Sequence, residues 1–194
     1  MGEGGALLIR DKKYIQEAEI IREKGTNRSQ YYRGQVDKYR WMNYGSSYLP
    51  SDMNAAYLWA QLELAKEITK ARLERWVQYH TQLQPLQERG ILELPVIPEG
   101  CIHNGHMYYA KAKDMEERTR LLAFLKENGI LSVFHYVPLH TAPAGLKFGE
   151  FRGEDIYTTK ESERLFRLPL FFTLKESEVD YIVSKIKEFY GVSY

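Results

Sequence analysis

The chain has 194 residues, of which 27 are basic and 26 acidic, so its formal net charge is +1. This balance gives no electrostatic reason to expect nucleic acid or a membrane surface as a partner. Cys101 is the single cysteine, which excludes an internal disulfide and suits a reducing compartment. No apolar run approaches the roughly 18 residues of a membrane span, so we expect a cytoplasmic protein.

Three features are predicted in the first 50 residues. The apolar run at residues 6–9 is typical of a buried strand, although no strand-like neighbour follows before residue 90. Asp11 is a suitable N-cap for a helix over residues 12–25, which Gly25 can end. Residues 26–50 show no clear periodicity and are predicted as a long loop, a feature that is most often functional or docked on a partner.

A long amphipathic helix is predicted over residues 51–84, with Ser51 as its N-cap. Roughly 30 residues at about 1.5 Å each give a rod of about 45–50 Å, which is more than a small domain covers. We therefore expect this helix to connect two bodies. Its apolar spacing departs from strict heptads, which disfavours a coiled coil.

The remainder of the chain alternates between predicted strands and helices. Strands are predicted at residues 91–97, 106–113, 130–140 and 167–172. Three helices begin at capping patterns, which are Asp114 with Glu117, Thr158 with Glu161, and Thr173 with Glu176. The pattern indicates an α/β sandwich of about four strands with helices on one face.

The five histidines are candidates for metal binding or acid–base chemistry. His103 and His106 lack the neighbouring ligands of a zinc site, so no metal site is predicted. In HYVPLH, the two-residue period of a strand places His135 and Tyr136 on opposite faces, and Pro138 turns the chain so that His140 emerges at the strand end. Ligand contacts often lie there, and a solvated edge histidine is the alternative.

Other motifs are less specific. TNRSQYYRG offers Arg28, Arg33 and several hydroxyls, which suit phosphate groups, with a solvated loop as the alternative. GEGG lacks the spacing of a dinucleotide-binding turn. Acidic residues interleave the basic ones on the long helix, which indicates a solvated face instead of a nucleic-acid surface. The residues alone therefore predict a binding protein without an identifiable catalytic group.

Five segments together resemble the DegT/DnrJ/StrS-type sugar-nucleotide aminotransferases, which use pyridoxal 5′-phosphate (PLP). They are GEGGALLI, AEIIREKGTNRSQYYRGQVDKYRW, GSSYLPSDMNAAYLWAQLE, FHYVPLH and GEDIYTTKESERLFRLPLF. The resemblance implies transfer of an amino group from a donor such as glutamate to the C4 keto group of a dTDP-4-keto-6-deoxy sugar, for biosynthesis of a cell-surface polysaccharide, the enterobacterial common antigen. The alternative is a non-catalytic binding or dimerisation module that retains this half of the fold.

The resemblance also implies a domain assignment. In the family, a TKN segment with the Schiff-base lysine lies just before the GEGG strand, and Met1 occupies that place here. We therefore expect the C-terminal part of a fold-type-I PLP aminotransferase, with no catalytic lysine of its own and no activity alone. Residues 1–50 would be a remnant of the large PLP-binding domain, 51–84 the connecting helix, and 85–194 the small α/β domain.

Site residues follow from the same resemblance. Family active sites are built across a homodimer, and the segment before NAAYLWAQLE reaches the partner's cofactor phosphate, which implicates Ser46 and Ser47. Many relatives carry Asn at the position of Ser47. The loop with Arg28 approaches the nucleotide in the family, and HYVPLH faces the sugar, which makes the expected substrate-binding residues Arg28, His135, Tyr136 and His140. The expected partners are a dTDP-sugar and an amino-acid donor.

Overall fold

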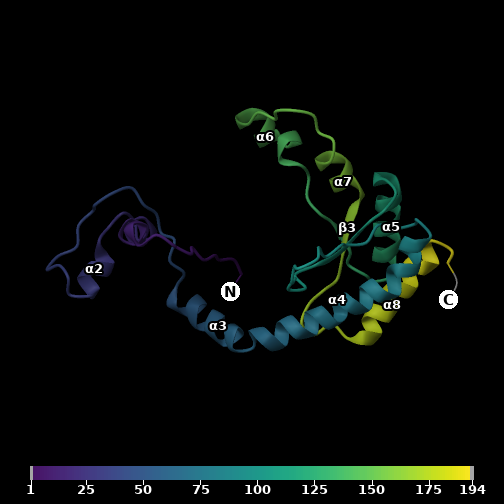
Figure 1. The fold of residues 1–194 in the computed structure, drawn as a ribbon, viewed down its shortest axis with the longest axis horizontal. Helices are drawn as coiled ribbons and strands as arrows, with labels where there is room; N and C mark the ends of the chain where they lie inside the picture. The colour runs from purple at the N-terminus through teal and green to yellow at the C-terminus, as the bar shows by residue number, and fades with distance from the viewer. Residues whose placement is uncertain (1, 193–194) are drawn as a thin grey trace. The chain divides into compact units, whose positions relative to one another are not determined.

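The computed structural model describes residues 2–192, which form two compact units. The first unit extends to Ala65 and the second begins at Lys66. Figure 1 shows the elements of both units in order along the chain. Within the described part of the chain, no helix is both long enough and apolar enough to cross a membrane. The assignment of residues 1–50, 51–84 and 85–194 to the domains of an aminotransferase stays a prediction.

The first unit contains a short helix, and the segment that follows the helix folds back toward it. A 3₁₀ turn, η1 (Lys12–Tyr14), leads into α1 (Ile15–Arg22), and the Asp11 carboxylate accepts a hydrogen bond from the Lys13 backbone at 3.1 Å, as the cap prediction requires. The segment predicted as a loop contains α2 (Arg28–Tyr32). Two single bridges, Glu23 to Ser47 and Thr26 to Trp41, join the two sides of this segment.

Two sequence predictions for this region are wrong. Residues 6–9 form no strand, and Leu7 and Leu8 are 77% and 92% exposed. A strand needs a neighbour to pair its backbone groups, and no described segment supplies one. The predicted long helix is two helices, α3 (Asp52–Glu63) and α4 (Ala65–Glu88), interrupted at Leu64. Pro85 lies in the last turn of α4, where the helix lacks the hydrogen bond that the nitrogen of another residue would donate.

The second unit contains a three-stranded antiparallel sheet with the strand order β1-β3-β2. Its strands are β1 (Tyr108–Lys111), β2 (Val133–Phe134) and β3 (Leu165–Leu168). Arg167 on the central strand lies opposite both Tyr109 and Val133. The predicted strand at 91–97 is reduced to one bridge, between Glu93 and Lys111, and the other predicted strands are shorter than expected.

The hydrophobic core lies on one face of this sheet. Buried and half-buried residues alternate along β1 and β3, and three helices pack on the buried side: α4, α5 (Met115–Glu127) and α8 (Glu176–Phe189). Figure 1 shows α4 and α8 side by side, where Gln78 and Gln82 donate hydrogen bonds to Asp180. The α/β prediction with helices on one face is confirmed, with three strands in place of about four. The largest fully buried side chains are Tyr79, Tyr108, Phe166, Leu83, Leu86, Leu121 and Leu125.

Helix caps in this unit differ in part from the predictions. Asp114 caps α5 as expected, because its carboxylate accepts from the Glu117 backbone at 2.9 Å. The predicted cap of α8 at Thr173 is wrong. The helix begins two residues later than a Thr173 cap would place it, and the Glu178 carboxylate accepts from the Lys175 backbone at 2.7 Å.

Between β2 and β3 the chain forms three short helical segments. They are η2 (Leu139–Thr141), α6 (Pro143–Phe148) and α7 (Thr158–Arg164). The first overlaps the end of the strand predicted at residues 130–140, and the third matches the helix predicted from the pattern of Thr158 with Glu161.

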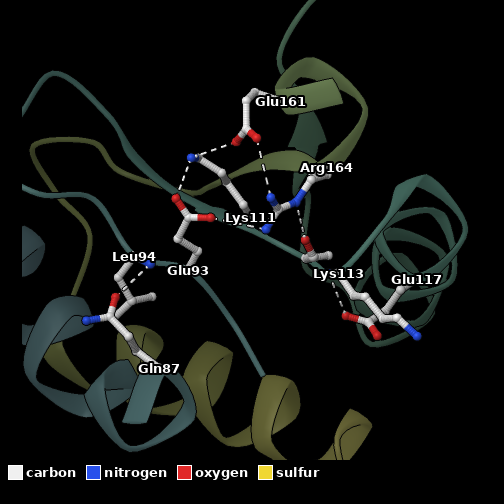
Figure 2. Close-up of polar contacts among 9 residues, drawn as sticks. Gln87, Glu93, Leu94, Lys111, Lys113, Glu117, Glu161 and Arg164 are labelled. Atoms are coloured by element: carbon white, nitrogen blue, oxygen red, sulfur yellow. Dashed lines mark hydrogen bonds and ion pairs between the residues drawn. The ribbon is translucent and has the colours of Figure 1, made fainter. Parts of the chain in front are cut away.

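Four charged side chains fix α7 to β1 in a closed ring (Figure 2). Lys111 Nζ lies 2.6 Å from Glu93 and 2.7 Å from Glu161. Arg164 closes the ring at 3.1 Å from Glu93 and 3.4 Å from Glu161. The hydrogen bond from Lys111 is the main reason that the pKa of Glu161 lies below its ordinary value. Alternating charges therefore hold together three segments that are distant in sequence.

Candidate functional site

The two serines expected at the cofactor phosphate lie on an exposed segment that returns to α1. The Ser46 backbone donates to the Ile21 carbonyl at 2.9 Å, and the Ser46 carbonyl accepts from the Lys24 backbone at 3.0 Å. Both serines are exposed, and neither hydroxyl has a hydrogen-bond partner among residues 2–192. Two available hydroxyls on a backbone that is itself fixed suit a phosphate oxygen as acceptor.

A close approach of two glycines fixes the backbone next to these serines. A Cβ on Gly45 would lie 2.2 Å from the Gly25 nitrogen and 2.6 Å from the Ile21 carbonyl oxygen. A Cβ on Gly25 would lie 1.7 Å from the Asn43 carbonyl oxygen, and Gly25 has a φ of +75°. Neither position therefore accommodates a side chain without a shift of the backbone. In the sequence, this contact is indicated only by the glycines themselves, Gly25 in KGT and Gly45 in YGS.

Arg28 lies at the start of α2 and is partly engaged within its own unit. Its guanidinium donates to the Tyr32 hydroxyl at 2.6 and 3.1 Å and lies 3.8 Å from Glu23. The hydrogen bond with Tyr32 raises the pKa of Arg28 above its ordinary value. With 42% of its side chain exposed, the guanidinium keeps donors accessible to a ligand. Arg33 is instead paired with both carboxylate oxygens of Glu19, at 2.8 and 2.6 Å.

Asn27 is a residue that sequence reasoning missed. It is buried, and its backbone and side chain both bond to Arg40: the Asn27 nitrogen donates to the Arg40 carbonyl at 3.2 Å, and Asn27 Oδ1 accepts from the Arg40 nitrogen at 2.7 Å. These bonds close residues 27–40 into a loop that carries Arg28. Asparagine is common where a side chain completes backbone hydrogen bonds in a turn, which is the only signal the sequence offers.

His135 and Tyr136 follow β2 directly and lie together. Because side chains alternate along a strand, His135 shares the face of Val133 and Arg167. His135 Nδ1 is buried and has no hydrogen-bond partner in the described part of the chain. Burial lowers the pKa of His135, and the charges of Arg167 and His106 lower it further.

Tyr136 departs from the regular alternation that the sequence predicts. Its φ of +52° lies in the left-handed region, which is uncommon for a bulky residue. Its ring lies 5.0 Å from the His135 ring, and its side chain is 71% exposed. The prediction that opposite strand faces separate His135 from Tyr136 therefore does not hold at the end of β2.

His140 lies in η2 and is held by an aspartate that the sequence analysis did not single out. Its Nε2 lies 2.8 Å from Asp155 Oδ2. Asp155 also caps the start of α7, where it accepts from the Thr159 nitrogen at 3.2 Å and from the Thr159 hydroxyl at 2.5 Å. The hydrogen bond from Thr159 lowers the pKa of Asp155, so a charged carboxylate faces the imidazole near neutral pH. Asp155 therefore caps α7 in place of Thr158, which the sequence predicts as the cap.

The candidate residues thus belong to two groups. Ser46, Ser47 and Arg28 lie in the first unit, whereas the residues of HYVPLH lie in the second. The first unit also contains an apolar hollow of about 920 Å³ between residues 5–9 and α1, and Tyr48 and Leu49 line its rim. No three His, Cys, Asp or Glu side chains within residues 2–192 are placed to hold a metal ion together.

Comparisons with known proteins identify similar chains. The family model of the DegT/DnrJ/EryC1/StrS aminotransferases matches residues 1–187. The pleiotropic regulatory protein of Geobacillus stearothermophilus is 30% identical over 197 aligned residues, which cover 97% of this chain and 48% of that protein. The chain therefore spans about half the length of this relative.

Solved structures give the same coverage. The aminotransferase TlmJ from Streptoalloteichus hindustanus matches with a TM-score of 0.78 and 21% identity, over 94% of this chain and 46% of that chain. Helicobacter pylori PseC, an aminotransferase involved in the biosynthesis of pseudoaminic acid, matches with a TM-score of 0.75 and 15% identity, over 93% of this chain and 47% of that chain. At this level of identity the similarity shows the fold.

Proposed function

This chain belongs to the DegT/DnrJ/EryC1/StrS aminotransferase family, and we propose that it forms the C-terminal half of a PLP-dependent sugar-nucleotide aminotransferase. The observation that carries the proposal is the family match over residues 1–187, combined with relatives about twice as long. The whole enzyme transfers an amino group from a donor such as glutamate to the C4 keto group of a dTDP-4-keto-6-deoxy sugar.

The segment TNRSQYYRGQVDKYRW supports a more specific activity, that of dTDP-4-amino-4,6-dideoxygalactose transaminase. That enzyme acts in the biosynthesis of the enterobacterial common antigen. The single cysteine of this chain suits the cytoplasm, and the family resemblance implies a homodimer.

Ser46 and Ser47 are suited to bind the phosphate of PLP. Their hydroxyls are exposed and lack protein partners, and the glycine contact behind them fixes the backbone that carries them. In a homodimer these hydroxyls would donate hydrogen bonds to the phosphate of the cofactor in the partner subunit. When bound, PLP supplies an electron sink for proton removal at the substrate carbon.

The substrate-binding residues divide by the chemistry of their side chains. Arg28, on the loop closed by Asn27, offers a guanidinium to the nucleotide part of the substrate. His140, oriented by Asp155, offers a ring nitrogen to a sugar hydroxyl, and Tyr136 offers a phenol. His135 offers a buried ring nitrogen without a protein partner. These groups bind and orient the sugar and leave the cofactor chemistry to residues outside this chain.

The test of the activity uses the protein expressed from the whole gene, including any in-frame coding sequence upstream of the Met1 codon. We expect this protein, with PLP and L-glutamate, to convert dTDP-4-keto-6-deoxyglucose into an amino sugar nucleotide, detected by mass spectrometry together with 2-oxoglutarate. Absence of both products from a folded, PLP-loaded protein would contradict the proposal. An upstream frame without a TKN-type lysine segment would favour the non-catalytic module instead.

A second assay addresses the 194-residue chain alone. Because we place the cofactor-binding lysine upstream, we expect no borohydride-stable PLP adduct and no transamination by this chain. A stoichiometric adduct on one lysine of the chain, mapped by peptide mass spectrometry, would contradict that placement.

A further inference from the structure

Arg167 occupies the centre of the sheet face that lies opposite the hydrophobic core. It belongs to β3, the middle strand, and its neighbours across the ladder are Tyr109 on β1 and Val133 on β2. The adjacent residues Phe166 and Leu168 are buried in the core, so alternation directs Arg167 to the other face. The side chain is partly buried, and its Nε is inaccessible to solvent.

The guanidinium of Arg167 has no acceptor within residues 2–192. Its Nε lacks a hydrogen-bond partner, and no carboxylate forms an ion pair with it. The other five partly buried arginines of the described chain each form a hydrogen bond or an ion pair through the guanidinium, although Arg118 Nε is also unpaired, and they are Arg28, Arg72, Arg75, Arg118 and Arg164. A buried donor without an acceptor costs about 1–3 kcal/mol, which marks Arg167 as an exception that requires an explanation.

A second unsatisfied polar atom lies close to this guanidinium. His135 Nδ1 is also buried without a partner, and the charge of Arg167 acts on the His135 ring. The Arg167 guanidinium carbon lies 5.8 Å from the centre of the Tyr136 ring, and the two rings of His135 and Tyr136 are 5.0 Å apart. A guanidinium on β3 and an imidazole just after β2 therefore both lie next to the exposed phenol of Tyr136.

The charged groups elsewhere on this face do not neutralise Arg167. Lys111 lies on the same face of β1, and both carboxylates of the ring in Figure 2, Glu93 and Glu161, are engaged with Lys111 and Arg164. Among the described residues, the charge of Arg167 is thus left without a carboxylate partner, and an anion is the ligand that complements it.

We propose that Arg167 and His135 form a binding site for an oxyanion of the substrate, with the guanidinium as its main donor. A carboxylate or a phosphate meets this requirement, because each accepts two hydrogen bonds from a guanidinium. The assignment rests on the proposed function, in which the amino donor supplies carboxylates and the sugar nucleotide supplies a diphosphate. Arg167 is then a substrate-binding residue in addition to those that the sequence predicted.

The test measures anion binding by the 194-residue chain with three probes: inorganic phosphate, dTDP and L-glutamate. Binding is followed by titration calorimetry and by the imidazole resonances of His135 in NMR spectra. We expect at least one probe to bind and to shift the His135 signals. Arg167→Gln should weaken that binding by at least about 10-fold, since it removes a charge-assisted hydrogen bond. Arg167→Lys, which keeps the charge, should restore part of the affinity.

Arg152→Gln is the matched control, because Arg152 is exposed and already paired with Glu150 at 3.3 Å. Its affinity should equal that of the unmodified chain, and amide spectra establish that each variant is folded. If Arg167→Gln does not fold, the site is tested by the affinity of Arg167→Lys and by the shifts of the His135 imidazole signals in the unmodified chain. Binding of none of the probes, or equal losses in both Gln variants, would overturn the site. Phosphate binding that depends on Arg167 in a protein without aminotransferase activity would retain the site and reject the proposed function.

Discussion

Asp155 Oδ2 lies 2.8 Å from His140 Nε2 and closes a loop between these two residues, which are 15 positions apart in the sequence. The same carboxylate caps α7 through Thr159, so one side chain joins the two ends of the loop. Within the loop, a Cβ on Gly145 would lie 1.7 Å from the Leu139 carbonyl oxygen, which shows how closely α6 approaches η2. His140 therefore has a defined position, although it lies outside regular strands and long helices.

The Asp155 carboxylate is expected to stabilise the protein in a pH-dependent way. Its pKa is lowered in the folded state, so its contribution is complete above the ordinary carboxyl pKa of about 4 and is lost as the pH falls through the folded-state value. Asp155→Asn should therefore lower the urea midpoint at pH 7, and the difference from the unmodified chain should be smaller at pH 3. Glu154→Gln, at an exposed neighbouring position, should change neither midpoint. A difference that persists unchanged at pH 3 would refute the role of the charge.

The charged ring around Lys111 should contribute measurably to stability. Lys111→Met leaves Glu93 and Glu161 without one of their two cations, and we expect a loss of about 1–2 kcal/mol, between the values for exposed and for fully buried pairs. Lys126→Met serves as the control, because Lys126 is exposed and outside the ring. Urea unfolding of both variants at low and high salt measures the effect. Equal stabilities would show that the ring contributes nothing.

The contact between Gly45 and Gly25 predicts a strong local effect of a single methyl group. Gly45→Ala places a Cβ 2.2 Å from a backbone nitrogen that cannot move freely, and we expect a loss of about 2 kcal/mol or more together with displacement of Ser46 and Ser47. Gly5→Ala has open space around its Cβ and should be nearly neutral. Hydrogen exchange of residues 21–48 compares the two variants. Similar protection in both would contradict the proposed close packing.

His140 and His135 should affect substrate use in the longer, catalytically complete protein. Replacing either with Ala removes one hydrogen bond to a bound polar substrate, which costs about 1–3 kcal/mol, or roughly 5- to 150-fold in kcat/KM. The absorbance of bound PLP should not change. If these histidines are purely structural, the variants will instead show a lower Tm with nearly normal kinetics. Measurement of kcat/KM and Tm for each variant separates the two roles.

Features that depend on neighbouring residues could be predicted from the amino-acid sequence. Asp11 and Asp114 were predicted as helix caps, and both accept backbone hydrogen bonds from residues two or three positions later. The helix predicted to begin at the Asp114 cap is α5, because its apolar period and its cap are properties of one continuous segment. The family resemblance likewise came from ordered local motifs, and the family match over residues 1–187 confirms it.

Features that join distant segments became visible in the folded chain. Glu93 and Arg164 are 71 positions apart in the sequence, and His140 and Asp155 are 15 positions apart. No local periodicity could therefore predict either pair. Residues 6–9 have the composition of a strand, yet strand formation depends on a neighbouring strand that the described chain does not supply. Arg167 stands in an ordinary apolar strand sequence, and only its position between β1 and β2 shows that its guanidinium lacks an acceptor. Long-range pairing is set by how the backbone folds in space, and a one-dimensional pattern does not contain that information.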